Sequence, residues 1–374
     1  MSITRRSMLK GSAAASTLLA APAILKAGDA LASSGQVNVF AWGDYIQQNM
    51  IDKFEGDTGI SINLSTYGSN DEAVQKLKAA GGKGFDVIMP SVTNGILYYP
   101  DELLQPLDES KLNLDAIIPS MLRDSVQLGA TYRGKRMLLP FNWGTEGVTF
   151  DSSVMPLADD EVSFGSLWAP EAAGKAAFRQ KSALAGTGLY LDAIGEVKSN
   201  RMLDAFKSEE DAHRVYGAVA QFIIDNKANI AAFWNNATEA SNAFTQAGAS
   251  IGQTWDTTGL LLNRQDAKWK YRMPKEGGLT WMDSMGIPSG SENLDQAYAF
   301  INAMLDPRMG GLHSANTGYN SAMVGAADHA GEDYKAQFSS VYTAENMANL
   351  WWWPSDRPWT STIVGEYVDL ITNA

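Results

Sequence analysis

Apolar and polar positions in the first third of the chain follow two periods in turn, the two-residue period of strands and the longer period of helices. Helical stretches at 44–57 and 69–80 separate short β-rich runs at 37–42, 60–66 and 85–89. Ser69, with Glu72 three residues later, is a capping-box signature for the second helix. This alternation is typical of a doubly wound α/β lobe, in which helices cover a mainly parallel sheet.

The rest of the chain predicts a second α/β lobe. Strands are expected at 137–150, 249–255 and 279–287, around a mostly helical region at 151–248. Asn293, with Gln296 three residues later, predicts another capped helix. Because the chain crosses between the lobes more than once, the crossings form a hinge, and a ligand cleft is expected where strand ends of both lobes meet. The predicted lobes are 33–141 plus 283–327, and 142–282 plus 328–374.

The N-terminus has the features of an export signal. Arg5 and Arg6 precede a mild apolar stretch at 13–25, which is too short and too weak to anchor a helix in lipid. The small residues of 30–32 predict cleavage after Ala32. The adjacent arginines indicate the twin-arginine pathway, so residues 1–32 are expected to be a signal peptide and the mature protein to be periplasmic.

Composition narrows the classes of function. The formal charge of −13 disfavours nucleic acid and anionic membranes as partners and raises the local concentration of cations. The chain has no cysteine, which excludes disulfides, thiolate catalysis and cysteine-type metal sites. Its three histidines occur in no metal-ligand spacing. We therefore expect no metal and no cofactor.

Tryptophan next to a carboxylate is a recurring feature of the predicted strands. Four of the eleven tryptophans fall in or at the ends of strands: Trp42, Trp143, Trp255 and Trp281. Three of them have a carboxylate within two residues, in the pairs Trp42 and Asp44, Trp255 and Asp256, and Trp281 and Asp283. An indole face attracts a cation and a carboxylate adds a charge-assisted hydrogen bond, so these pairs suit an organic ammonium or guanidinium. The alternative is that the indoles only fill the core.

Several motifs resemble the spermidine/putrescine-binding periplasmic proteins. They are F-A-W-G-D-Y-I at 40–46, T-Y-G-S-N-D-E at 66–72, F-D-V-I-M-P-S at 85–91, L-W-A-P-E at 167–171, P-K-E-G-G-L-T-W-M-D-S at 274–284 and T-G-Y at 317–319. The matches keep the family order over nearly the whole mature chain. The resemblance implies a type II periplasmic-binding-protein fold and the solute-binding subunit of an ABC importer. Such a protein is not an enzyme, and we expect a monomer that delivers its ligand to an inner-membrane permease.

The resemblance also implies binding residues, position by position. From these matches we expect the ligand to contact Trp42, Asp44, Tyr45, Ser91, Thr93, Trp255, Trp281, Asp283 and Tyr319.

One departure from the family pattern concerns the far end of the ligand. Where polyamine-binding members carry carboxylates, this chain has Lys181 and Leu184. In one explanation, Arg179, Lys181 and Ser182 open a helix N-terminus that receives an anionic group, which makes the ligand a zwitterionic ω-amino acid, opine or aminophosphonate. In the other, these side chains face solvent and Glu146 or Asp256 supplies the missing charge for a polyamine-like cation.

Two more distant alternatives remain open from the sequence. Paired carboxylates among Asp44, Glu146, Asp256 and Asp283 could serve an exported hydrolase. A ferric-iron carrier of the same fold could use Tyr98 and Tyr99, although adjacent aromatics in a predicted helix more often divide into one buried and one exposed residue. The run Trp351-Trp352-Trp353-Pro354 suits a cleft wall, a partner surface or a packed C-terminal segment.

Overall fold

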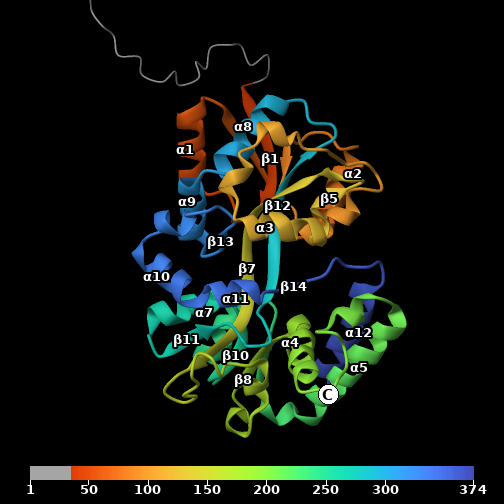
Figure 1. Cartoon of the computed structure of the whole chain (residues 1–374), viewed down its shortest axis with the longest axis vertical. Coiled ribbons are helices and arrows are strands. Elements are labelled where there is room, and N and C mark those ends of the chain that lie inside the picture. Colours follow the sequence, from red (N-terminus) through yellow and green to blue (C-terminus); the bar gives the residue numbers. More distant parts are fainter. Residues whose placement is uncertain (1–34) are drawn as a thin grey trace, which may run out of the picture.

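A computed structural model describes residues 35–374, which form two lobes stacked along the long axis of the molecule (Figure 1). Two long strands run between the lobes, β7 (Leu138–Asp151) and β12 (Leu279–Pro288). They pair antiparallel from Leu279 opposite Glu146 to Gly286 opposite Leu138, with a register shift at Asp283. The predicted signal peptide lies outside the described residues.

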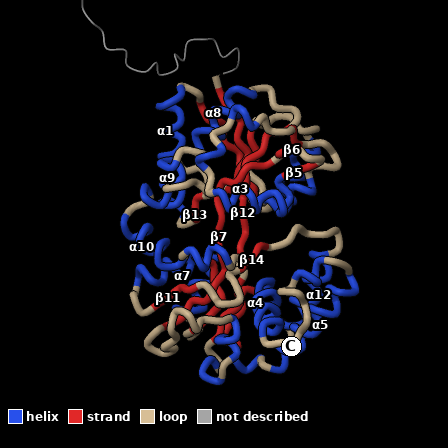
Figure 2. Tube along the Cα trace, in the orientation of Figure 1, coloured by secondary structure: helices blue, strands red, loops and turns tan. Residues whose placement is uncertain are grey.

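In the first lobe, helices pack around a mainly parallel sheet (Figure 2). Strand β1 (Gln36–Trp42) pairs in parallel with β2 (Ser61–Tyr67) and with β3 (Val87–Ile88), and β12 joins antiparallel to β3. The helices of this lobe are α1 (Gln48–Thr58), α2 (Asn70–Ala79), α3 (Pro119–Ser125), α8 (Leu294–Met304) and α9 (Pro307–Thr317). The short strands of this lobe are β4 (Leu104–Gln105), β5 (Thr131–Tyr132), β6 (Lys135–Arg136) and β13 (Asn320–Ser321).

The second lobe is built around the other end of β7. Strand β10 (Ile251–Trp255) and strand β11 (Trp269–Arg272) pair antiparallel with β7, and β8 (Ala176–Arg179) joins β10 to β9 (Ile230–Trp234) in parallel. Its helices are α4 (Gln180–Ala193), α5 (Glu209–Asp225), α6 (Ala237–Thr245), α7 (Asp256–Gln265) and α12 (Thr360–Thr372). Between the lobes run α10 (Glu332–Val341), α11 (Ala344–Ala348) and β14 (Trp351–Trp352), which pairs with β12.

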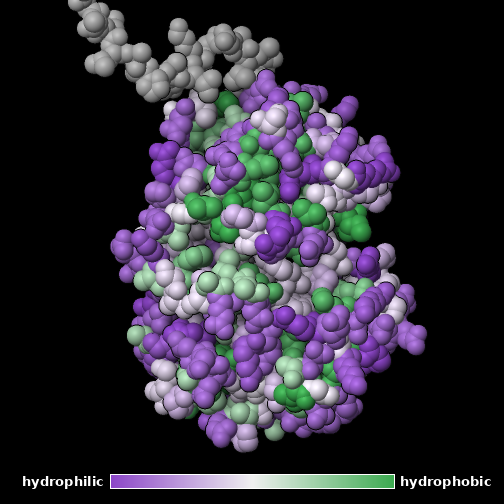
Figure 3. Space-filling model, viewed as in Figure 1, coloured by the Kyte–Doolittle hydropathy of each residue, from purple (hydrophilic) through white to green (hydrophobic). Residues whose placement is uncertain are grey.

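Separate apolar cores hold the two lobes. The first core packs β1 and α8 residues such as Phe40 and Phe300, and the second packs Phe178 of β8 against α4 and α5. Strand β7 contributes Trp143 to the first core and Val148 to the second, so it passes from one lobe to the other within a few residues. The exact lobe boundaries stay a prediction. On the face drawn in Figure 3, apolar side chains gather mostly over the first lobe.

Most predicted elements are confirmed, with local corrections. The first helix begins at Gln48 instead of residue 44, because the chain turns after β1 and Tyr45 donates its backbone N–H to Trp42. Ser69 caps α2 by accepting from the backbone of Glu72, as predicted. The predicted side-chain cap at Asn293 is wrong, because its amide donates instead to Asp86 of the first lobe.

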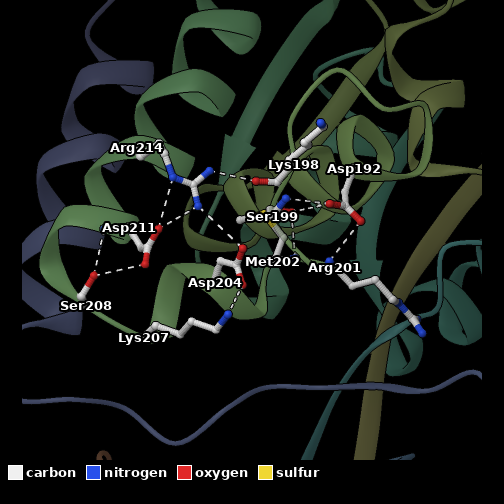
Figure 4. Close-up of polar contacts among 10 residues, drawn as sticks. All are labelled: Asp192, Lys198, Ser199, Arg201, Met202, Asp204, Lys207, Ser208, Asp211 and Arg214. Atoms are coloured by element: carbon white, nitrogen blue, oxygen red, sulfur yellow. Dashed lines mark hydrogen bonds and ion pairs between the residues drawn. The ribbon is translucent and has the colours of Figure 1, made fainter.

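A polar cluster in the second lobe stabilises a strained turn (Figure 4). Asn200, Arg201 and Met202 all have positive φ, between 50° and 65°, which costs free energy for residues with a Cβ. Asp192 offsets this cost by accepting from the backbone N–H groups of Ser199 at 2.7 Å and Arg201 at 3.0 Å. This turn also anchors the C-terminal segment, because the carbonyl of Arg201 accepts a hydrogen bond from the indole N–H of Trp351 at 2.7 Å. In the described part of the chain, no helix is long and apolar enough to cross a membrane.

Candidate functional site

A cleft of about 370 Å³ lies between the lobes, at the ends of strands from both. From the first lobe come the end of β1 with the turn after it, the start of α2, the residues after β3 and the loop before β13. The second lobe contributes the ends of β8 and β10 and the start of α4, while β12 and the segment after β14 complete the walls. The lining residues are Trp42, Asp44, Tyr45, Asn70, Ser91, Thr93, Asn94, Leu128, Arg179, Lys181, Trp255, Thr280, Trp281, Met282, Asp283, Tyr319, Trp353, Pro354 and Asp356.

The structure places most of the predicted binding residues in this one cleft. The exceptions are Glu146 and Asp256, whose side chains are fully buried and do not line it. Trp143, a predicted strand tryptophan without a carboxylate, is a core residue whose indole donates to the carbonyl of Ser321. Ligand contact by the lining residues stays a prediction.

The first-lobe end of the cleft contains the buried carboxylate of Asp283. Its carboxylate is 4% exposed and accepts a short hydrogen bond from the Tyr45 hydroxyl through Oδ2, while Oδ1 has no hydrogen-bond partner among the described residues. Burial raises the pKa of Asp283 to about 6, although the hydroxyls of Ser91 and Tyr45 lower it, and the charge of Asp44 adds to the rise. The buried Nε1 of Trp42 also has no partner within the described chain. A buried acceptor and a buried donor that are both unpaired are costly unless a ligand satisfies them.

Tyr45 is held in place by a buried histidine on α9. Asn142 of β7 donates its amide N–H to Nε2 of His313 at 3.0 Å, so Nδ1 carries the proton and donates to the carbonyl of Tyr45 at 3.2 Å. Burial lowers the pKa of His313 to about 4, which keeps the ring neutral. This chain of contacts orients the tyrosine that donates to Asp283.

The indole of Trp281 lies against β7 and forms another wall of this end. A Cβ on Gly144 would meet Cζ2 of Trp281 at 2.3 Å, so the close approach of the ring requires glycine there. Tyr319 packs edge-on against the same ring, with centroids 5.3 Å apart. Asp44 lies nearby and is more exposed than Asp283, and partial burial raises its pKa as well. Two carboxylates and two indoles therefore surround the first-lobe end.

The second-lobe end is basic. The guanidinium of Arg179 donates to Glu146 at 2.5 Å and lies 4.8 Å from the centre of the Trp255 ring. The ammonium of Lys181 lies 5.1 Å from the centre of the Trp353 ring. Here the indoles hold cations of the protein itself.

Glu146 and Asp256 were predicted as binding residues, but both are buried among groups of the protein and neither lines the cleft, so this geometry does not support a ligand contact for them. Glu146 lies behind Arg179 and is its ion-pair partner. Asp256 accepts from the Tyr342 hydroxyl at 2.6 Å, the Asn320 amide at 2.9 Å and the backbone of Thr145 at 3.1 Å. Burial raises the pKa of Asp256 to about 6 despite these bonds. Asp256 thus ties α7 to β7 and to β13 at the hinge, and neither carboxylate is placed to replace a missing acidic group of the cleft.

The C-terminal segment, residues 351–356, supplies three lining residues that the sequence motifs did not predict. Trp353, Pro354 and Asp356 line the cleft, and the Ser355 hydroxyl donates to the carbonyl of Leu128 in the first lobe at 3.0 Å. The tryptophan run marked this segment as a candidate wall, but no spacing rule showed which lobe it meets. Asn70, also not predicted, holds Ser91 through two hydrogen bonds of 3.1 Å.

The distant alternatives find little geometric support. Tyr98 and Tyr99 are both buried in a turn, and burial raises both pKa values, which disfavours the phenolates that ferric iron requires. The expectation of one exposed residue in this pair was wrong. Of the four carboxylates that a hydrolase could use, Asp44 and Asp283 line the cleft, whereas Glu146 and Asp256 lie outside it. Among the described residues, no group of three His, Cys, Asp or Glu could hold a metal.

Comparison with known proteins assigns the chain to a protein family. The family described as bacterial extracellular solute-binding protein matches residues 49–338. This chain belongs to that family. The spermidine/putrescine-binding periplasmic protein of Salmonella typhimurium is 26% identical over 336 residues, covering 88% of this chain and 89% of its own. A putrescine/cadaverine-binding protein of Pseudomonas aeruginosa is 28% identical over 303 residues, covering 76% and 79%.

Solved structures of this family share the fold. The spermidine/putrescine ABC transporter substrate-binding protein PotD of Streptococcus pneumoniae superposes with a TM-score of 0.72 at 24% identity, covering 90% of this chain and 98% of its own. The predicted type II periplasmic-binding-protein fold is therefore confirmed, and so is the resemblance on which it was based. Members of this family bind small solutes outside the cytoplasm, and the named relatives are binding proteins.

Proposed function

We propose that this protein is the substrate-binding subunit of an ABC importer and captures a small solute that carries an ammonium or guanidinium group, as polyamines do. The observation that carries the proposal is the first-lobe end of the cleft. There the unpaired Oδ1 of the buried Asp283 lies in a cavity that is also lined by Trp42, Trp281 and Asp44. A positive nitrogen satisfies this arrangement through a charge-assisted hydrogen bond and contacts with indole faces.

The relatives support the same ligand chemistry. Those named above bind spermidine, putrescine or cadaverine, which all carry ammonium groups. Their identity with this chain is 26–28%, so the similarity supports the ligand class and leaves the individual ligand open.

Capture works by hinge closure. The cleft has walls from both lobes, and the lobes are joined by the paired strands β7 and β12. A ligand that contacts both walls binds the closed state more tightly than the open state and shifts the population toward it. An inner-membrane permease then recognises the closed, loaded monomer. On this proposal the protein works in the periplasm, after twin-arginine export directed by residues 1–32.

A calorimetric screen tests the proposal. Diamines, triamines, guanidino compounds and amino acids with a terminal ammonium are titrated into the purified mature chain, with neutral diols of equal length as controls. We expect saturable binding of at least one positively charged compound and none of the diols. The proposal is refuted if no compound with an ammonium or guanidinium group binds, or if a ligand is chemically altered on incubation.

A further inference from the structure

The two ends of the cleft differ in whether their indoles already hold a cation. At the second-lobe end, Arg179 covers Trp255 and Lys181 covers Trp353. Within the described residues, no cation of the protein lies over Trp42 or Trp281. A ring face that is covered by one cation is not available to a second. A positive group of the ligand is therefore directed to the first-lobe end, beside Asp283.

Arg179 is arranged to receive an anion. One Nη1 hydrogen bond holds it to the buried Glu146, and its other N–H groups form no hydrogen bond with the described residues. The contact with the Trp255 ring and this single tether hold the guanidinium in place, and its remaining donors fit the two oxygens of a carboxylate or phosphonate. Glu146 largely balances the charge of Arg179, so the guanidinium contributes mainly directed donors.

Uncompensated positive charge at this end comes from Lys181 and the start of α4. Lys181 has no carboxylate partner among the described residues. Helix α4 has no acidic residue in its first turn and no capping side chain. In that turn Ser182 is fully buried, and its hydroxyl has no partner within the described chain. A helix N-terminus adds partial positive charge, so this wall attracts an anion.

One group opposes this conclusion. Asp356 of the C-terminal segment also lines the cleft and is the carboxylate through which a dication would be held at this end. Asp356 contributes one negative charge. Lys181, the N-terminus of α4 and the guanidinium donors of Arg179 all favour an anion, so they outweigh it.

We propose that the ligand is a zwitterion, with its ammonium or guanidinium group at Asp283 and a carboxylate or phosphonate at Arg179 and Lys181. This inference rests on the proposed function and specifies the ligand class of the same cleft. A cleft of about 370 Å³ suits a small solute with a short spacer between its two charged ends.

Matched pairs of probes test the inference by calorimetry. Each pair has one spacer length and differs at one end only, as in 4-aminobutanoate against 1,4-diaminobutane and 6-aminohexanoate against 1,6-diaminohexane; an amino-terminated phosphonate extends the series. The variants are Lys181→Gln, Arg179→Lys and Asp356→Asn. Arg179→Lys keeps the ion pair with Glu146 and removes the planar fork. Lys207→Gln removes one lysine charge from the surface cluster of Figure 4, away from the cleft, and is the matched control.

We expect the wild type to bind a zwitterion at least tenfold more tightly than the matched diamine. Lys181→Gln should weaken zwitterion binding about tenfold or more, since a charge-assisted contact is lost, and should not weaken diamine binding. Arg179→Lys should also weaken the zwitterion, and Lys207→Gln should change neither affinity. Tight diamine binding that depends on Asp356, with no zwitterion binding, overturns this inference and leaves the proposed function standing. Failure of both classes to bind overturns this inference, and it removes the proposed function as well if the guanidino compounds of the earlier screen also fail to bind.

Discussion

Replacing Asp283 by asparagine should weaken ligand binding and, at neutral pH, stabilise the unliganded protein. The side chain is 4% exposed, and burial raises its pKa from 3.8 to about 6. A carboxyl group with a raised pKa is protonated in the folded state and ionised in the unfolded state between these two values. Folding stability is therefore fully present below about pH 4, falls as pH rises toward 6 and stays reduced above that.

The expected sizes follow from these values. At about 1.4 kcal/mol per pKa unit, ionised Asp283 lowers the free energy of unfolding by roughly 3 kcal/mol at pH 7.5. Asparagine has nearly the same shape, cannot ionise and can still accept from Tyr45. The variant should therefore unfold at higher urea concentration than the wild type at pH 7.5 and at a similar concentration at pH 4. A lost charge-assisted hydrogen bond of about 1.5–3 kcal/mol weakens binding about tenfold to a hundredfold.

Urea titrations at the two pH values and calorimetry between pH 5 and 8 give the measurements. Wild-type affinity should fall about fivefold between pH 6 and pH 5, because the ligand requires the ionised carboxylate and the ionised fraction of a group with a pKa of about 6 falls by that factor, whereas the variant should show little pH dependence. Asp333→Asn, an exposed carboxylate on α10, is the matched control and should change neither quantity. Unchanged affinity in Asp283→Asn, or a variant no more stable than the wild type at pH 7.5, would refute the reasoning.

Three further substitutions test other parts of the site. Arg179→Met leaves Glu146 buried without its partner and should cost about 3–5 kcal/mol in urea unfolding, most of which Glu146→Gln should restore in the double variant. Gly144→Ala forces its Cβ against Trp281 and should weaken ligand binding in calorimetry while far-ultraviolet circular dichroism stays the same. His313→Ala removes the support of Tyr45 and should lower both the melting temperature and the ligand affinity.

For each of these three substitutions, one outcome would contradict the expectation. A double variant as unstable as Arg179→Met would show that the ion pair is not the source of the loss. Full ligand affinity in Gly144→Ala would mean that the position of the Trp281 ring does not matter. A His313→Ala protein that loses stability but binds as before would assign the histidine to packing alone.

The fold class could be predicted from local patterns, and most of the cleft residues could be predicted from the motifs shared with the spermidine/putrescine-binding proteins. Period-two and helical runs placed the strands and helices within a few residues, and strand ends in an α/β sheet gather at one edge. Trp42, Asp283 and Tyr319 were predicted by motif, and each lies in the cleft. The first helix was predicted too early, since apolar spacing continues through a turn and does not reveal where the chain leaves the strand.

The charge balance of the cleft was decided by contacts between residues far apart in the chain. Trp255 was predicted as a surface for the cation of a ligand, but Arg179 lies on its ring. Glu146 looked like a spare carboxylate for the cleft and is the buried partner of that arginine. The local sequence does not show whether an indole face is free for the cation of a ligand or is already covered by a cation of the protein.

The sequence by itself thus determined two α/β lobes, a hinge and a set of aromatic and acidic side chains at strand ends, because each follows from spacing along one segment. Tertiary structure alone decided which of these groups are already paired, and it brought the C-terminal segment against Leu128 as a further wall. The physical reason is that pairing depends on distances across the interlobe gap, which the folding of both lobes sets together. Those distances separate an acidic end from a basic end in one small cavity.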